Sequence, residues 1–328
     1  MKRRQVLKAG AGLAAMLAAP GTWAQAGGYP NRLIKILVPY GPGGSPDVIA
    51  RLIAAKLAQA LGQPVIIDNR PGAGGMMGSE LAAASPADGY NLFFAVKAPM
   101  AIVPHLYPNA KYNALRDFKA VTEILIVPHI ITATPSAPYN TLMELVEYAK
   151  RNPGKVDYAS SGVGSQPHVA LAALAVRLGI KLNHVPYKAN MRTDVMSGIV
   201  SLYLEASTTA IPSIKAGKIK ALATSGAERI PTLPDVPTLT EIRADLDPNG
   251  VIGNSWHGIF APAGTADDIV ARLNTEIVKI VKAQDVQERM HALGLTPTGT
   301  SAAALAATVS SDFAYWGKLV RDLDIKVE

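Results

Sequence analysis

The chain has 328 residues, of which 32 are Lys or Arg, 25 are Asp or Glu, six are His and none is Cys. This length suits one large domain or two medium ones. A content of 49% hydrophobic and 17% charged residues supports packed cores and excludes wholesale disorder. Without Cys, the chain has no disulfide, no thiolate metal site and no cysteine nucleophile.

Residues 1–26 have the pattern of a cleaved secretory signal peptide. Four basic residues and no acid precede a short apolar run over 9–19, and the small-residue motif Ala24-Gln25-Ala26 follows. The run is too short to span a bilayer, although a membrane anchor or a buried helix is the alternative. The pair Arg3-Arg4 also fits a twin-arginine export signal, and ordinary Sec export is the other route.

The net charge depends on this segment. The formal charge is +7, and removal of the four basic residues leaves 28 basic against 25 acidic residues, a net charge of +3. This charge does not indicate a nucleic acid or an anionic membrane as partner. No later segment has 18 uncharged apolar residues, so we expect a soluble mature chain. Its lack of Cys suits a bacterial periplasm, where a core of this size needs no disulfides.

The first part of the mature chain alternates strand and helix patterns. Short β-branched runs predict strands over 33–38, 65–67 and 92–96, and helical spacing predicts helices over 45–61 and near 78–84. We predict that Ser45 caps the first helix, that Pro46 is its first residue and that Gly62 ends it. The β-α-β-α-β order predicts a parallel sheet with right-handed crossovers.

A second set of elements begins near residue 129. Strands are predicted over 130–133, 156–159, 182–185, 200–204, 219–224 and 258–261, and helices over 141–151, 167–178, 266–282 and 302–323. The segment 228–253 is rich in Pro and Asp and is predicted to be irregular. We predict two α/β lobes around a cleft, the first from residues 27–128 and 255–328 and the second from 129–254.

The loop after the first strand has the composition of an anion site. It contains Tyr40, Gly43, Gly44, Ser45 and Asp47 at the carboxyl end of a predicted parallel strand, where ligands bind in open sheets. Glycine lets the backbone approach a ligand, and the following helix directs free N–H groups towards it. A carboxylate is the expected ligand; a tight strand-to-helix connection without a ligand is the alternative.

The second lobe repeats this pattern over residues 158–168. Ser165 either caps the following helix or donates to a ligand oxygen, and Gly164 precedes it in the loop. His168 lies in the first helical turn, where the helix dipole disfavours its protonated form. A half-buried structural histidine is the alternative for His168.

Enzyme signatures are poor in this chain. There is no G-x-S-x-G elbow, Walker loop or H-E-x-x-H helix, and the six His residues have no metal-ligand spacing. We therefore predict no catalytic residue, metal or cofactor. An exported hydrolase that uses Ser165 and His168 with Asp47 or Glu205 is a weaker alternative, because residues three apart do not by themselves form a nucleophile–base pair.

Several ordered motifs resemble the Bug receptors, the periplasmic solute-binding proteins of the tripartite tricarboxylate transporter family. The resemblance covers nearly the whole mature chain. It rests on Val38-Pro39-Tyr40 with Gly43-Gly44-x-x-Asp47, Asp68-Asn69-Arg70-Pro71-Gly72-Ala73-Gly74-Gly75, Asp88-Gly89-Tyr90, Tyr158-Ala159-Ser160-Ser161-Gly162-x-Gly164-Ser165-x-x-His168, His184-Val185-Pro186-Tyr187-Lys188, Leu233-Pro234-Asp235-Val236-Pro237-Thr238 and Phe260-Ala261-Pro262-Ala263-Gly264-Thr265.

The resemblance implies a fold and a function. The fold is two Rossmann-like lobes that close on a ligand, the Venus-flytrap architecture of periplasmic binding proteins. The function is capture of a small organic acid in the periplasm and its delivery to inner-membrane permease subunits, with no cofactor, no nucleic acid and no covalent chemistry. A monomer is expected. A receptor that feeds a signalling partner is the alternative.

The resemblance also implies site residues. The loop 40–47 holds a carboxylate, partly through ordered waters, and the loops around Gly162–His168 and Tyr187-Lys188 complete the site. The chain departs from the family pattern at Lys97, at Arg192 and at Leu204-Glu205-Ala206. We hypothesise that Lys97 or Arg192 pairs with a second acidic group of the ligand, favouring a dicarboxylate or another polyanion. Solvated surface cations are the alternative for both.

Overall fold

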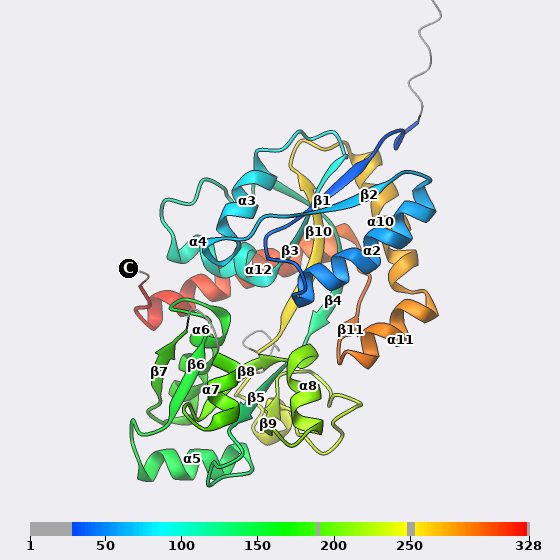
Figure 1. Cartoon of the computed structure of the whole chain (residues 1–328). Coiled ribbons are helices and arrows are strands. Elements are labelled where there is room, and N and C mark those ends of the chain that lie inside the picture. The colour runs from blue at the N-terminus through cyan, green and yellow to red at the C-terminus, as the bar shows by residue number, and fades with distance from the viewer. Residues whose placement is uncertain (1–27, 188–190, 248–252, 327–328) are drawn as a thin grey trace, which may run out of the picture.

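The computed structural model describes residues 28–187, 191–247 and 253–326. They form two mixed sheets, one of six strands in the order β11-β4-β10-β3-β1-β2 and one of five in the order β7-β6-β8-β5-β9. Each sheet and its helices form one lobe, and Figure 1 shows the two lobes one above the other. The predicted two-lobe α/β fold is confirmed. The predicted signal peptide lies outside the described residues.

The first-lobe sheet combines the predicted parallel strands with antiparallel strands. Strands β2, β1 and β3 are parallel, and β10 then pairs antiparallel with both β3 and β4. The ten-residue strand β4 was not predicted. The strand bounds are Ile34–Val38 for β1, Val65–Asn69 for β2, Asn91–Val96 for β3, Phe118–Val127 for β4, Ser255–Pro262 for β10 and Thr296–Pro297 for β11.

Helices cover both faces of this sheet. On one face, Ile49, Ile53 and Leu57 of α2 pack with the apolar stripe of α10 against β1 and β3. On the other face, α3 and α12 pack on Leu37 and Phe93. The helix bounds are Ser45–Leu61 for α2, Ala73–Gly75 for η1, Met76–Ala83 for α3, Ala98–Ile102 for η2, Val103–Leu106 for α4, Asp267–Val281 for α10, Gln284–Ala292 for α11 and Ala302–Asp322 for α12.

The second-lobe sheet has the same mixed character. Strands β7, β6 and β8 are parallel, and β5 pairs antiparallel with β8 and β9. The segment predicted to be irregular contains the short helix α9, which starts with a capping box of Thr238 and Glu241. The bounds are His129–Ala133 for β5, Leu142–Arg151 for α5, Asp157–Ser160 for β6, Gln166–Leu178 for α6, Asn183–Pro186 for β7, Met191–Ser197 for α7, Leu202–Ala206 for β8, Ser207–Lys215 for α8, Lys220–Thr224 for β9 and Leu239–Ile242 for α9.

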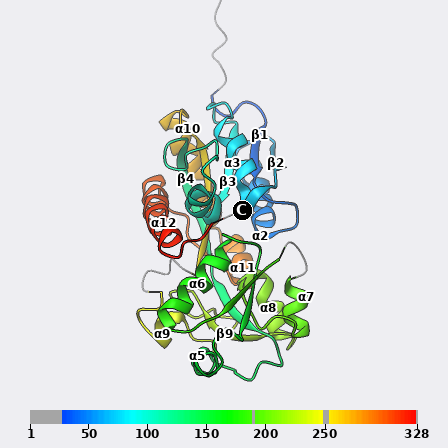
Figure 2. The same ribbon diagram turned by 90° about the vertical axis from the view of Figure 1, so that its left-hand side faces the viewer.

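The C-terminal helix α12 joins the lobes. Its fully buried Trp316 and its Val320 share one apolar cluster with Leu171 and Leu174 of α6 in the second lobe. Figure 2 shows α12 descending from the first lobe towards α6. None of the described helices combines the length and the apolar sequence needed to cross a membrane.

The strand directions bring the predicted site loops to the lobe boundary. The carboxyl ends of β1, β2 and β3 lie at the sheet edge where β4 ends and β10 begins, since β10 is antiparallel to both β3 and β4. The chain crosses between lobes there, through Pro128 and Asn254. In the second lobe, the carboxyl ends of β6, β7 and β8 lie at the edge where β5 begins. Both sets of loops therefore border the boundary.

Candidate ligand-binding site

Asp47 fixes the first-lobe loop. Its Oδ2 accepts hydrogen bonds from the N–H of Gly43 at 2.9 Å and from Arg51 Nε at 3.0 Å. Its Oδ1 accepts from Asn69 Nδ2 at 2.9 Å and lies 3.0 Å from Arg51 Nη2. Burial by itself would raise the pKa of Asp47, but the hydrogen bonds from Arg51, Gly43 and Asn69 hold it below its usual value. Asp47 is thus an ionised support for the loop, neutralised by Arg51.

The start of α2 differs from the prediction by one residue. The N-cap is Gly44, with φ −73° and ψ 164°, and Ser45 is the first helical residue. Gly44 has no side chain to cap the helix, so the acidic Asp47 in the first turn complements the dipole instead. Ser45 Oγ is buried and has no hydrogen-bond partner in the described chain. Tyr40 donates its hydroxyl to the carbonyl of Gly74 at 3.3 Å, joining the two glycine-rich loops.

Lys97 is buried at the lobe boundary. Its side chain is 3% exposed, and its Nζ lies 3.5 Å from Asp312 Oδ2 of α12. Burial lowers the pKa of Lys97 below its usual value, whereas the carboxylates of Asp312 and Asp247 act in the opposite direction. Trp256 Nε1 also donates to Asp312, at 2.7 Å. The alternative that Lys97 is a solvated surface cation is therefore wrong, because its ammonium group is enclosed and ion-paired within the protein.

The second-lobe loop fixes the tautomer of His168. The backbone N–H of Gly164 donates to His168 Nδ1 at 3.0 Å. Burial, followed by the neighbouring His184, lowers the pKa of His168 to about 4. The neutral ring must therefore carry its proton on Nε2, from which it can donate to a ligand. Ser165 is the N-cap of α6, but its hydroxyl donates to the carbonyl of Gly162 at 2.7 Å.

Two further aromatic rings support His168. His184 stacks on it with ring centroids 3.8 Å apart and an interplanar angle of 10°. Tyr158 stacks on His184 at 5.0 Å, and Ser160 Oγ lies 2.6 Å from His184 Nε2. This stack holds the imidazole of His168 in one orientation and disfavours its protonation.

Arg192 and Glu205 form an ion pair near the carboxyl end of β8. Arg192 Nε lies 2.6 Å from Glu205 Oε1, and Arg192 Nη2 donates to the carbonyl of Thr209 and to Ser213 Oγ, both at 2.9 Å. Burial raises the pKa of Glu205, and its contacts with Thr209 and Arg192 oppose that shift. Arg192 is 42% exposed at its side chain but is paired within the protein.

Tyr187 follows β7 on the same edge. The N–H of Tyr187 donates to the carbonyl of Ser160 at 2.9 Å, which attaches this segment to the end of β6. The phenol ring packs against the apolar cluster that contains Val195 and Tyr203. Lys188 lies outside the described residues.

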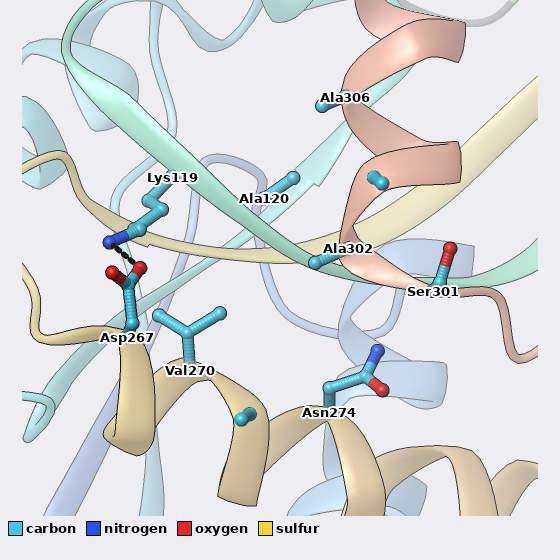
Figure 3. A pocket seen from close by; sticks show the side chains of 10 residues that line it. Lys119, Ala120, Asp267, Val270, Asn274, Ser301, Ala302 and Ala306 are labelled. Atoms are coloured by element: carbon cyan, nitrogen blue, oxygen red, sulfur yellow. Dashed lines mark ion pairs between the residues drawn. The ribbon is translucent and has the colours of Figure 1, made fainter.

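A separate pocket lies on the first lobe, away from these loops. It has a volume of about 500 Å³ and is lined by α10, the start of α12 and β4. Figure 3 shows its small apolar side chains, including Ala120, Ala302 and Ala306, and the ion pair of Lys119 with Asp267 at one end. None of the predicted site residues lines this pocket.

Comparison with known proteins identifies the family. Residues 49–325 match the family described as "Tripartite tricarboxylate transporter family receptor". The chain belongs to this family. The receptor is 33% identical over 303 residues to "Protein BugT" of Bordetella pertussis, covering 92% of each chain. The predicted membership of the Bug family of solute-binding receptors is therefore confirmed.

Solved structures agree with this assignment. The receptor is 31% identical to "R. palustris Rpa4515 with adipate", with a TM-score of 0.81, and the match covers 91% of this chain and 99% of the other. It is 30% identical to "MatC (Rpa3494) from Rhodopseudomonas palustris with bound malate", with a TM-score of 0.77 and coverage of 89% and 100%. The two-lobe fold is that of a periplasmic binding protein.

The hydrolase alternative is wrong, since the receptor belongs to a family of binding proteins. The geometry agrees, because Ser165 donates to Gly162 and His168 Nδ1 accepts from Gly164, so the two side chains do not bond to each other. The sequence analysis did not predict the ion pair between Asp47 and Arg51, which holds the first-lobe loop. Their spacing of four residues on one helix is typical of such a pair and could have indicated it.

Proposed function

We propose that this receptor captures a small carboxylate between its two lobes. The observation that carries the proposal is that α2 and α6 begin at the two sheet edges that border the lobe boundary. The N-terminal end of a helix presents free N–H groups and a partial positive charge, so it favours an anion. Ser45 Oγ and His168 Nε2 add neutral donors beside these two helix ends.

Charge balance at the site supports binding by neutral donors. Arg51, Lys97 and Arg192 each pair with a carboxylate of the chain, namely Asp47, Asp312 and Glu205. In the described part of the site, oriented dipoles therefore remain for the ligand after these three cations are paired. The ion pairs hold the loops in the geometry that the ligand meets.

The relatives suggest the first ligands to test. One related structure holds adipate and another holds malate, and both ligands carry two carboxylates. We infer that this receptor binds small organic acids of the same class. Ligand contacts from both lobes would stabilise a closed arrangement of the lobes.

The biological setting follows from the family and the N-terminal sequence. We infer that residues 1–26 direct export to the periplasm and are removed, and that the monomeric receptor delivers its ligand to the membrane permease subunits of a tripartite tricarboxylate transporter. We assign residues 27–128 and 255–328 to the first lobe and 129–254 to the second. The strand membership of the two sheets supports these limits.

Thermal unfolding of residues 27–328 with a panel of acids tests the proposal. The panel contains adipate, succinate and malate, the monocarboxylates hexanoate and butyrate, and neutral controls. A ligand at 100 times its dissociation constant adds about 2.7 kcal/mol to the free energy of unfolding, which raises the unfolding temperature by several degrees. A rise with at least one acid supports the proposal; stabilisation by neutral solutes alone would contradict it.

A further inference from the structure

Asn69 lies where the candidate anion loop leaves the first-lobe sheet. It is the last residue of β2 and is paired with Val38, the last residue of β1. The N–H of Arg70 donates to the carbonyl of Val38 at 2.8 Å, so the ends of the two strands are held together. The loop 40–47 begins two residues after Val38. The end of β2 is therefore the part of the sheet closest along the ladder to the start of that loop.

The Asn69 side chain bonds to both ends of the loop 40–47. Its Nδ2 donates to the carbonyl of Tyr40, the first residue of the loop, at 3.0 Å. The same nitrogen donates to Oδ1 of Asp47, the last residue of the loop, at 2.9 Å. One half-buried side chain from β2 thus fixes the two ends of the loop relative to each other. Gly43 and Gly44 lie between these ends.

These contacts require a carboxamide. The side chain of Asn69 has two donor hydrogens and one carbonyl oxygen. Both hydrogens have acceptors, at Tyr40 and Asp47, and Oδ1 accepts from Arg51 Nη2 at 3.1 Å. Arg51 also pairs with Asp47, so the side chains of Asp47, Arg51 and Asn69 form a closed ring. A carboxylate at position 69 can only accept, and it would face the Tyr40 carbonyl and the Asp47 carboxylate, which also only accept.

Close packing against α3 also restrains the start of the loop. A Cβ atom on Gly78 would lie 2.7 Å from Pro39 Cβ and 2.8 Å from the carbonyl oxygen of Arg70, closer than Cβ atoms approach other atoms in proteins. Glycine at this position therefore lets α3 pack directly on the ends of β1 and β2. The start of the loop is held between β2 and α3, and Asn69 is the side chain that joins it to Asp47.

We propose that Asn69 is a positioning residue of the receptor. This inference rests on the proposed function, in which the start of α2 binds a ligand carboxylate. Asn69 acts through Tyr40 and Asp47, and it holds the loop so that the backbone N–H groups at its glycines keep one direction. Donors that are already ordered bind an anion more tightly, because ordering a loop during binding costs free energy.

Substitutions at Asn69 and at a matched control residue test this assignment. Asn69→Ala removes the three hydrogen bonds, and Asn69→Asp removes both donors while keeping the shape of the side chain. Asn274 is the control, because its Nδ2 also donates to two backbone carbonyls of the first lobe, those of Val121 at 2.7 Å and Thr300 at 2.9 Å. It lines the separate pocket of Figure 3, none of whose residues belongs to the site loops.

The first measurement needs no ligand. Hydrogen exchange of the Gly43 N–H, followed by NMR in the chain of residues 27–328, reports directly on the loop, since this N–H donates to Asp47. We expect exchange to be about 10-fold faster in Asn69→Ala than in wild type, and to change by less than about twofold in Asn274→Ala. Unchanged exchange in Asn69→Ala, or equal acceleration in both variants, would overturn the assignment.

The second measurement is calorimetric titration with adipate and with malate, after circular dichroism melts have established that each variant is folded. At pH 8 we expect Asn69→Ala and Asn69→Asp to bind the acid that wild type binds about 10- to 100-fold more weakly, the range for one or two lost hydrogen bonds. Asn274→Ala and Asn274→Asp should change the affinity by less than about twofold.

The pH dependence separates a missing donor from a general loss of stability. The charged residues around position 69 are Asp47, Arg51, Asp68 and Arg70. A carboxyl group placed beside the Asp47 carboxylate binds a proton more readily, and once protonated it donates again. The affinity of Asn69→Asp, taken relative to wild type at each pH, should therefore recover in part between pH 8 and pH 5, whereas that of Asn69→Ala should not.

Three titration results would overturn the assignment of Asn69 and leave the proposed function standing. They are an unchanged affinity in Asn69→Ala, an equal loss in Asn274→Ala, and a loss in Asn69→Asp that does not vary with pH. Wild type that binds no acid of any kind contradicts the proposed function itself. The role of Asn69 in binding then fails with it, and hydrogen exchange at Gly43 still tests whether Asn69 holds the loop.

Discussion

His168 and His184 lie face to face, with ring centroids 3.8 Å apart and planes inclined by only 10°. They come from different elements, His168 from α6 and His184 from β7. Burial and this stacking lower the pKa of His168 to about 4, and burial also lowers the pKa of His184. The stack keeps a neutral donor at the lobe boundary.

The first prediction concerns stability at acid pH. The unfolded chain protonates histidine near its usual pKa of about 6.5, whereas folded His168 resists protonation down to about pH 4. Its contribution to stability is therefore complete above pH 6.5 and is lost as the pH falls towards 4. His168→Gln should flatten part of this slope in urea unfolding measured at several pH values. An unchanged slope in His168→Gln would contradict the prediction; the exposed His291→Gln is the control.

The second prediction concerns the first-lobe loop. Asp47→Asn removes the ion pair with Arg51 while keeping a side chain of the same shape. We expect the free energy of unfolding to fall by about 1–3 kcal/mol, because a buried hydrogen-bonded charge is lost. The affinity for the ligand should fall as well, because one of the two oxygens that accept from Gly43 and Asn69 becomes an NH2 group, which cannot accept. Denaturant unfolding and ligand titration measure the two effects.

Asp68→Asn is the matched control for Asp47→Asn. Asp68 pairs with Lys35 and Arg70, whose side chains are 42% and 54% exposed. Exposed pairs contribute about 0–1 kcal/mol, so Asp68→Asn should change stability little. Equal effects of the two substitutions would show that Asp47 has no special role in the loop.

The third prediction concerns the buried pair of Lys97 and Asp312. Lys97→Met leaves the buried Asp312 carboxylate with its hydrogen bond from Trp256 but without its cation, so stability should fall by about 3–5 kcal/mol. The double variant Lys97→Met/Asp312→Asn should recover much of this loss, since no buried charge remains unpaired. Chemical denaturation of the four chains gives the coupling energy. Simple additivity of the two substitutions would argue against a direct interaction.

The fourth prediction concerns Arg192 and Glu205. Arg192→Gln removes the cation beside the buried carboxyl group of Glu205. Burial already raises the pKa of this group. The variant should be less stable by about 1–3 kcal/mol at pH 7, with part of the loss regained as the pH falls and Glu205 binds a proton. The double variant Arg192→Gln/Glu205→Gln should show a weaker pH dependence. A loss that stays constant from pH 7 to pH 5 in Arg192→Gln would exclude Glu205 as its cause.

Local sequence determined much of the fold. Strands β1, β2 and β3 each form from a short apolar run, and a cluster of turn residues follows each of the first two. Backbone preference and burial over a few residues are sufficient to determine these strands and loops. For this reason the order of strands and helices in the first half was predictable, as was the place of both candidate loops. Strand β4 was missed because Lys119 and Glu123 interrupt its apolar pattern. Helix α8 was missed because Pro212 lies inside it.

Tertiary structure decided what the charged and polar residues do. Lys97 is read from sequence as a cation for the ligand, but α12 returns from the other end of the chain and places Asp312 beside it. Glu205 is likewise paired with Arg192. These ion pairs form only when the fold brings the two residues together, and the partner of each buried charge depends on which groups are desolvated beside it. Local propensity specifies the strands and loops but carries no information on which side chains meet in the folded protein.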